Sequence, residues 1–244
     1  MFQLKSYQQT TLDTLREYLD SARISDPSTA FQRMAPKNLY RPLPKLEDAP
    51  YVCLRLPTGG GKTLLATHSI SIAAHSFLEC DYPVVLWLVP TNSIKTQTLE
   101  TLQNPLHPNR QVLDQEFQGR VLVVDVTDFT QIRPQDLRDK VCIVVGTIAT
   151  PRVNSTELRK VYAHHEALEP HFTQITNHDP WLEKFEDGPN QGQLKYSFAN
   201  LLASLRPLVI IDEAHNASSS LSVEVLQRLH PSCIIEFTAT PAPN

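Results

Sequence analysis

The chain has no surplus of positive charge and no long apolar run. Its 22 Lys and Arg residues are balanced by 26 Asp and Glu residues, for a formal net charge of -4. No broad positive field marks it as a nucleic-acid binder, so any such contact is expected from a local surface. No apolar stretch approaches the ~20 residues that cross a bilayer, and the N-terminus lacks the basic-then-apolar pattern of a secretion signal. These absences predict a cytoplasmic protein without membrane contact.

Cysteine is scarce and scattered. Cys53, Cys142 and Cys233 stand in apolar runs, where a free cysteine behaves as a small buried hydrophobe. The histidines at 164, 165 and 171 have no cysteine or Glu-x-x-His pattern around them. The sequence therefore predicts neither a disulfide framework nor a zinc site.

Short runs rich in Val and Ile predict the strands of one sheet. They are apolar throughout rather than alternating, which is typical of parallel strands buried on both faces by helices. The runs are residues 51–56, 84–89, 121–126, 142–145, 208–211 and 233–237. The stretches between them are polar or helical. The predicted fold is α/β, a doubly wound and mainly parallel sheet flanked by helices.

Three other stretches complete the predicted organisation. Apolar residues at helical spacing predict an amphipathic helix over 6–20. Residues 24–50 are rich in proline and are interpreted as a connection. Residues 151–206 contain no strand signal, only helix-like patches at 155–168 and 194–205, and are interpreted as a helical insertion. With no internal repeat, residues 1–244 are expected to form one domain.

A phosphate-binding loop is predicted directly after the first strand and before a helical run. It reads Leu56-Pro57-Thr58-Gly59-Gly60-Gly61-Lys62-Thr63. Glycines let backbone N–H groups converge on phosphate oxygens, and the N-terminus of the next helix favours negative charge. Lys62 is expected to reach the β and γ phosphates, and the Thr63 hydroxyl to bind Mg²⁺. The stretch from Thr58 to Thr63 is therefore a predicted site for the phosphates of a nucleotide.

An acidic motif, Asp212-Glu213-Ala214-His215, follows the strand predicted at 208–211. Alone, an Asp-Glu pair after a strand is usually a solvated turn. In a chain with a phosphate loop, Asp212 can hold Mg²⁺ and Glu213 can orient or deprotonate the attacking water. Lys62, Asp212 and Glu213 are therefore predicted catalytic residues.

These motifs resemble those of DEAD/DEAH-type superfamily 2 helicases. Asp-Glu-Ala-His resembles their second motif, and Phe237-Thr238-Ala239-Thr240-Pro241 resembles the third. In that family the third motif links the acidic motif to nucleic acid, and the resemblance implies that His215 takes part in this link. Leu56 stands where the broad loop pattern has glycine, but the helicase version begins with a small or apolar residue. For Thr238 and Thr240, strand-end capping is the alternative.

Three weaker segments stand in the same order as in the family. Phe2-x-Leu4-Lys5-x-Tyr7-Gln8 resembles its adenine-recognition element, in which a glutamine amide pairs with the donor and acceptor of the base. Val89-Pro90-Thr91-Asn92-Ser93 and Gly146-Thr147-Ile148-Ala149-Thr150 resemble motifs that hold the sugar-phosphate backbone. The predicted contacts are Gln8 for the base, and Pro90, Thr91, Asn92, Gly146 and Thr147 for nucleic acid. Capping of helices after strands is the alternative for the last two segments.

The resemblance implies a RecA-like first motor domain that uses ATP and Mg²⁺. Within the superfamily, the loop sequence and the insertion most resemble the res subunit of type III restriction enzymes. That resemblance implies duplex DNA as track, a second RecA-like domain outside this chain and a methyltransferase subunit as partner. It also implies that the isolated chain hydrolyses ATP slowly. An RNA helicase motor and a nucleotide-binding module without motor activity are the alternatives. A P-loop kinase or GTPase would share the phosphate loop but would need its own substrate lid or guanine-specific motif, and no Asn-Lys-x-Asp string occurs.

Overall fold

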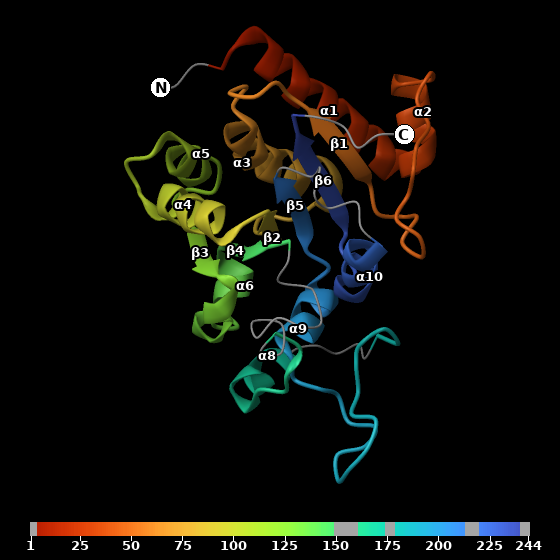
Figure 1. Cartoon of the computed structure of the whole chain (residues 1–244), viewed down its shortest axis with the longest axis vertical. Helices are drawn as coiled ribbons and strands as arrows, with labels where there is room; N and C mark the ends of the chain where they lie inside the picture. Colours follow the sequence, from red (N-terminus) through yellow and green to blue (C-terminus); the bar gives the residue numbers. More distant parts are fainter. Residues whose placement is uncertain (1–3, 149–160, 174–178, 213–219, 240–244) are drawn as a thin grey trace.

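The computed structural model describes residues 4–148, 161–173, 179–212 and 220–239, and its centre is one sheet. Every strand pair in it is parallel. The order is β1-β6-β5-β2-β4-β3 (Figure 1). The strands are β1 (Tyr51–Arg55), β2 (Val84–Val89), β3 (Val121–Asp125), β4 (Val141–Thr147), β5 (Leu208–Asp212) and β6 (Cys233–Thr238). The six predicted strands and the doubly wound parallel sheet are confirmed.

Two layers of helices cover the sheet. On β2, Val85 and Trp87 pack into one layer, and Leu86 and Leu88 into the other, because successive side chains point to opposite faces. The first layer contains α1 (Ser6–Ile24), α2 (Pro27–Met34), α3 (Lys62–Ala73) with the π-helical turn η1 (Ala74–Leu78), α4 (Asn92–Gln103) and α5 (Pro108–Glu116). The second contains η2 (Val126–Gln131), α6 (Asp136–Asp139), α9 (Phe198–Leu205) and α10 (Ser220–Leu229). Among the described residues, no helix is long and apolar enough to cross a membrane.

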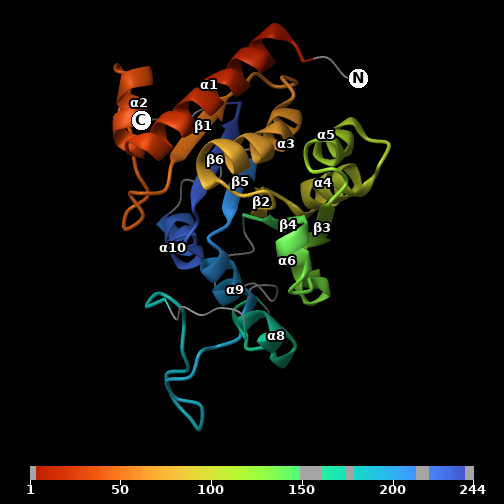
Figure 2. The same cartoon turned by 180° about the vertical axis from the view of Figure 1, so that it is seen from behind.

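Helix α3 is buried on nearly all sides, whereas α1 is amphipathic. Leu65 and Ile70 of α3 are fully buried, because the helix lies between the sheet, α1 and α5 (Figure 2). On α1 the buried residues Leu12, Leu15 and Leu19 recur at helical spacing, as predicted. The core therefore holds α3 firmly, with its first turn, Lys62 and Thr63, directly after the glycine loop.

Three details differ from the sequence predictions. Cys142 and Cys233 are buried, but Cys53 is exposed, because β1 is the end strand of the order and is not covered on both faces. The proline-rich stretch 24–50 contains α2, which begins where the Asp26 side chain accepts a hydrogen bond from the Thr29 N–H at 2.9 Å. The first helix also continues to Ile24, beyond its predicted end.

The predicted insertion is described in part. The 3₁₀ turn η3 (Glu166–Leu168) and α8 (Glu169–Phe172) lie beyond the end of the sheet, at the bottom of Figures 1 and 2. Residues 183–195 form a short hairpin closed by an antiparallel bridge between Lys184 and Leu194. The buried Asn200 of α9 holds this hairpin, because its Nδ2 donates to the carbonyls of Glu183 and Lys195, at 2.8 and 2.7 Å. Phe198 and Leu201 of the same helix pack on the sheet. Helix α9 thus belongs to the central core and anchors the rest of the insertion to it.

Candidate nucleotide site

The parallel sheet brings distant motifs to one edge. Strands β1, β6 and β5 are neighbours, so the segments that follow their carboxyl ends lie together. The loop after β1 is joined to the end of β6 by a hydrogen bond from Leu56 N to Thr238 O, at 2.9 Å. Asp212 ends β5, one strand further along. The predicted phosphate loop, the first residue of the acidic motif and the start of the third motif thus lie at the edge where α/β proteins bind ligands.

The glycine loop from Thr58 to Gly61 makes a tight turn before α3 and is the candidate anion cradle. Its turn is closed by a hydrogen bond from Gly60 N to Pro57 O, at 2.8 Å. Gly61 adopts the left-handed conformation, with φ 82° and ψ 35°, and is the N-cap of α3. The helix starts without a side-chain cap and without an acidic residue in its first turn. A helix start of this kind favours an anionic ligand, because the positive end of the helix dipole lies there.

Oxygen ligands suited to Mg²⁺ meet beside this cradle. The Thr63 hydroxyl donates to Asp212 Oδ2, at 3.4 Å, although the two residues are 149 positions apart. Asp212 and Lys62 are only 5% and 9% exposed. One hydroxyl and one carboxylate fit Mg²⁺, which usually takes few protein ligands and completes its shell with water and phosphate oxygens. The donor set therefore fits the predicted role of Thr63 and Asp212.

Helix α1 contacts the phosphate loop through two adjacent side chains. The buried Gln8 donates from Nε2 to Gly60 O at 2.9 Å, and its Oε1 accepts from Lys5 N at 2.9 Å. The Tyr7 hydroxyl donates to the same Gly60 carbonyl at 3.0 Å. One N–H and one lone pair of the Gln8 amide take no part in these three bonds, so contact with adenine stays a prediction. The sequence reasoning did not assign Tyr7 to the site, and its position beside Gln8 was the available signal.

The predicted nucleic-acid residues divide into exposed and buried groups. Thr91 and Asn92 are exposed at the start of α4, where the Thr91 side chain accepts from Ile94 N at 3.3 Å; Pro90 precedes them and is half-buried. Gly146, Thr147 and Thr238 are buried at the ends of β4 and β6. Thr91 thus serves as a helix cap, and only the first group presents side chains at the surface. Glu213, His215 and Thr240 lie outside the described residues.

A buried ion pair supports the opposite end of this edge. Lys95 Nζ of α4 lies 2.9 Å from Asp125 Oδ2 at the end of β3. Burial alone would raise the pKa of Asp125, but hydrogen bonds from Thr127 and Lys95 lower it below its ordinary value. The pair therefore holds the exposed start of α4 against the sheet as a charged unit. The sequence reasoning did not find this pair.

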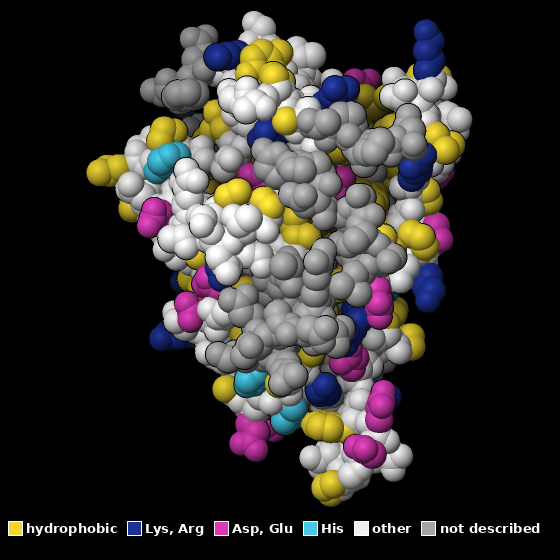
Figure 3. Space-filling model, in the orientation of Figure 1, with side chains coloured by type: hydrophobic (Ala, Val, Ile, Leu, Met, Phe, Trp, Pro, Cys, Tyr) yellow, Lys and Arg dark blue, Asp and Glu magenta, His cyan; other side chains and the backbone are white. Residues whose placement is uncertain are grey.

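The described surface has no single charged face in the view of Figure 3. Basic and acidic side chains are interspersed there, in line with the net charge of -4. Any backbone contact on this side is therefore expected from hydroxyls, amides and backbone N–H groups rather than from a basic patch.

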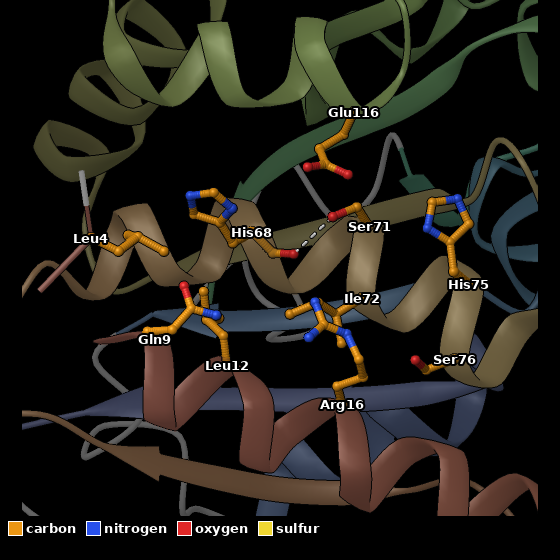
Figure 4. Close-up of a pocket in the computed structure, with 10 residues that line it drawn as sticks. All are labelled: Leu4, Gln9, Leu12, Arg16, His68, Ser71, Ile72, His75, Ser76 and Glu116. Carbon is orange, nitrogen blue, oxygen red and sulfur yellow. Dashed lines mark hydrogen bonds between the residues drawn. The ribbon is translucent and has the colours of Figure 1, made fainter. Parts of the chain in front are cut away.

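A separate polar pocket lies between α1, α3 and α5 (Figure 4). Arg16, His68, His75 and Glu116 contribute to its lining, and no lining residue belongs to the glycine loop. Burial lowers the pKa of His68. No group of three or more His, Cys, Asp or Glu residues in the described part of the chain is suited to a metal ion. The pocket is therefore a feature of the helix packing and not part of the nucleotide site.

The histidines of the insertion have structural contacts. The His164 ring nitrogen Nδ1 accepts from Tyr196 N at 3.0 Å, and the ring stacks on that of Tyr196. His165 packs edge-on against Phe129. His171 Nε2 lies 2.9 Å from Ile132 O. These contacts tie the insertion together and attach it to the second helix layer.

Comparisons with known proteins identify a family for the chain. A family model described as "Type III restriction enzyme, res subunit" matches residues 1–243. No curated protein sequence matches the chain. One similar solved structure is the helicase domain of Hef from Pyrococcus furiosus, with 16% sequence identity and a TM-score of 0.44. The match covers 98% of this chain and 33% of the Hef chain. Another is a nuclease-deletion mutant of the type ISP restriction-modification enzyme LlaGI in complex with a DNA substrate mimic, with 15% sequence identity and a TM-score of 0.44. The match covers 100% of this chain and 18% of the LlaGI chain. The chain thus spans about a third or less of either protein.

Proposed function

The chain belongs to the family of type III restriction enzyme res subunits, and we propose that it binds ATP and Mg²⁺ as the first motor domain of a superfamily 2 translocase. The observation that carries the proposal is the hydrogen bond between Thr63 and Asp212 beside the glycine cradle. It joins the two predicted Mg²⁺ ligands at the N-terminus of α3, where phosphate oxygens are favoured.

Each residue of the site has a distinct task in this proposal. The loop N–H groups and Lys62 hold the phosphates, and Thr63 and Asp212 would hold Mg²⁺. When bound, Mg²⁺ would supply neutralisation of phosphate charge. Glu213, the next residue after Asp212, orients the attacking water and accepts its proton. The water oxygen forms a bond to the γ phosphorus while the bond from that phosphorus to the β–γ bridging oxygen breaks. ADP leaves with the bridging oxygen, and the proton of the water passes to Glu213, so no covalent enzyme intermediate is needed.

Movement requires a second motor domain in the complete protein. Arginine residues from that domain complete the γ-phosphate site when the two domains close on ATP. Lack of such an arginine costs roughly a thousandfold or more in turnover, so this chain alone is expected to bind ATP and hydrolyse it slowly. We propose duplex DNA as the track, held through the exposed start of α4, and a methyltransferase subunit as partner.

Two substitutions separate binding from hydrolysis. Lys62→Ala is expected to abolish tight ATP binding, measured by titration with a fluorescent ATP analogue, because the buried ammonium is lost from the cradle. Lys37→Ala, which removes an exposed lysine, is the matched control and should bind normally. Glu213→Gln in the complete protein should retain binding and lose hydrolysis. Equal loss of both activities in Glu213→Gln would contradict its assignment to the water.

The track is tested by steady-state ATP hydrolysis of the complete protein. The assay compares no nucleic acid, duplex DNA, single-stranded DNA and RNA. Stimulation by duplex DNA supports a restriction-type translocase. Stimulation by RNA alone would keep the motor assignment and overturn the DNA assignment, and absence of ATP binding would leave a fold without motor activity.

A further inference from the structure

We propose that Tyr7 is a positioning residue that sets the orientation of the phosphate loop. The inference rests on the proposed nucleotide site and extends it to a residue outside the glycine loop and the acidic motif. Its starting point is the Gly60 carbonyl, which accepts hydrogen bonds from both Tyr7 Oη, at 3.0 Å, and Gln8 Nε2, at 2.9 Å. Two donors from one helix turn thus hold one carbonyl of the loop.

The two hydrogen bonds to the Gly60 carbonyl also fix the direction of the Gly61 N–H. In a planar trans peptide the C=O and the following N–H point in opposite directions. When α1 holds the Gly60 carbonyl, the Gly61 N–H is directed away from α1. Gly61 is the N-cap of α3, so its N–H belongs to the set of helix N-terminal donors that bind an anion. Tyr7, together with Gln8, therefore stabilises the peptide orientation that presents this donor to a phosphate.

The glycine loop needs such support because its glycines can adopt other backbone conformations. Gly59 and Gly61 both have positive φ, 72° and 82°, and glycine populates either sign of φ about equally. Rotation of the peptide between Gly60 and Gly61 would exchange an N–H for a carbonyl in the cradle, which repels a phosphate. The hydrogen bonds from α1 oppose that rotation.

Helix α1 is suited to act as the fixed side of this contact. Leu12, Leu15 and Leu19 are buried against the core, so the helix position is set by packing. Tyr7 itself is 40% exposed. Loss of its hydroxyl therefore removes the contact with the loop and leaves the packing of α1 in place.

The test is Tyr7→Phe, with Tyr18→Phe as matched control. Tyr18 lies on the same helix, and its hydroxyl donates to Pro27 O, at 3.4 Å, away from the loop. Binding of ATP, inorganic tripolyphosphate and adenosine is measured by competition with a fluorescent ATP analogue. Loss of one neutral hydrogen bond should weaken binding of ATP and tripolyphosphate in Tyr7→Phe by about 2- to 10-fold. Adenosine binding should be unchanged, and Tyr18→Phe should bind all three ligands like the wild type.

The outcomes separate this inference from the proposed function. Wild-type affinity of Tyr7→Phe for ATP and tripolyphosphate overturns the role of Tyr7 and leaves the nucleotide site standing. An equal loss for adenosine also overturns it, because a residue that orients a phosphate donor does not act on the base. If the wild-type chain binds no ATP, the proposed function fails, and this inference falls with it.

Discussion

Gly61→Ala is expected to destabilise the chain through its contact with α1. The residue has φ 82° and ψ 35°, a left-handed conformation that costs an L-amino acid about 1–2 kcal/mol. A Cβ atom at this position would also lie 2.6 Å from Gln8 Nε2, closer than any relaxed contact. The Gln8 amide must then move, and its buried hydrogen bond to Gly60 O is lost at a cost of about 1–3 kcal/mol. The free energy of unfolding should therefore fall by about 2–5 kcal/mol.

Gly59→Ala is the matched control in the same loop. Gly59 also has a positive φ, 72°, but no atom lies within 4 Å of its added Cβ. Gly59→Ala should therefore lower the free energy of unfolding only by the backbone strain, about 1–2 kcal/mol. Both variants are measured by urea unfolding, with the slope against urea monitored to verify that the compactness of the two states is unchanged.

A double-mutant cycle with Gln8→Ala isolates the contact. In the Gln8→Ala background no amide meets the new methyl group, so Gly61→Ala should cost about 1–2 kcal/mol there, the backbone strain alone. The coupling energy should thus be about 1–3 kcal/mol. The reasoning is refuted if Gly61→Ala costs the same in both backgrounds, or if Gly59→Ala costs as much as Gly61→Ala.

Two further predictions concern the edge of the sheet and the insertion. Because the pKa of Asp125 is lowered by folding, its stabilising contribution is complete above the unfolded value of ~3.9 and is lost as the pH falls through the folded value. Lys95→Met should lower the free energy of unfolding by about 1–3 kcal/mol at neutral pH. It should also weaken this acid dependence, measured by urea unfolding at each pH between about 5 and 3. An unchanged acid dependence would contradict the role of the pair. Asn200→Ala leaves the Glu183 N–H without its acceptor, Asn200 Oδ1 at 2.9 Å, and removes one of the two donors of the Glu183 and Lys195 carbonyls. It should lower the free energy of unfolding by about 1–3 kcal/mol in the same assay, whereas the exposed Asn190→Ala should be neutral. A neutral Asn200→Ala would show that the insertion is held by other contacts.

Sequence reasoning found the elements whose signals are local. The strand β2 was predicted at 84–89 and lies at Val84–Val89, because a buried parallel strand needs an unbroken apolar run. The helix at Pro27–Met34 was missed although Asp26 and Pro27 are ordinary start signals, because the surrounding prolines outweighed them. Cys53 was wrongly predicted as buried, because exposure depends on a strand's place in the sheet, and β1 lies at its end.

The sequence by itself determined the chemistry of the candidate site. A glycine loop ending in Lys62 and Thr63, and Asp212 after an apolar strand, are contiguous strings whose function depends on spacing along the chain. Only the tertiary structure decided which of these strings meet. The strand order β1-β6-β5 places Thr63 beside Asp212, and the packing of α1 along α3 places Tyr7 on the Gly60 carbonyl. Such pairings join residues far apart in the chain, and they depend on how the whole core packs rather than on any local pattern.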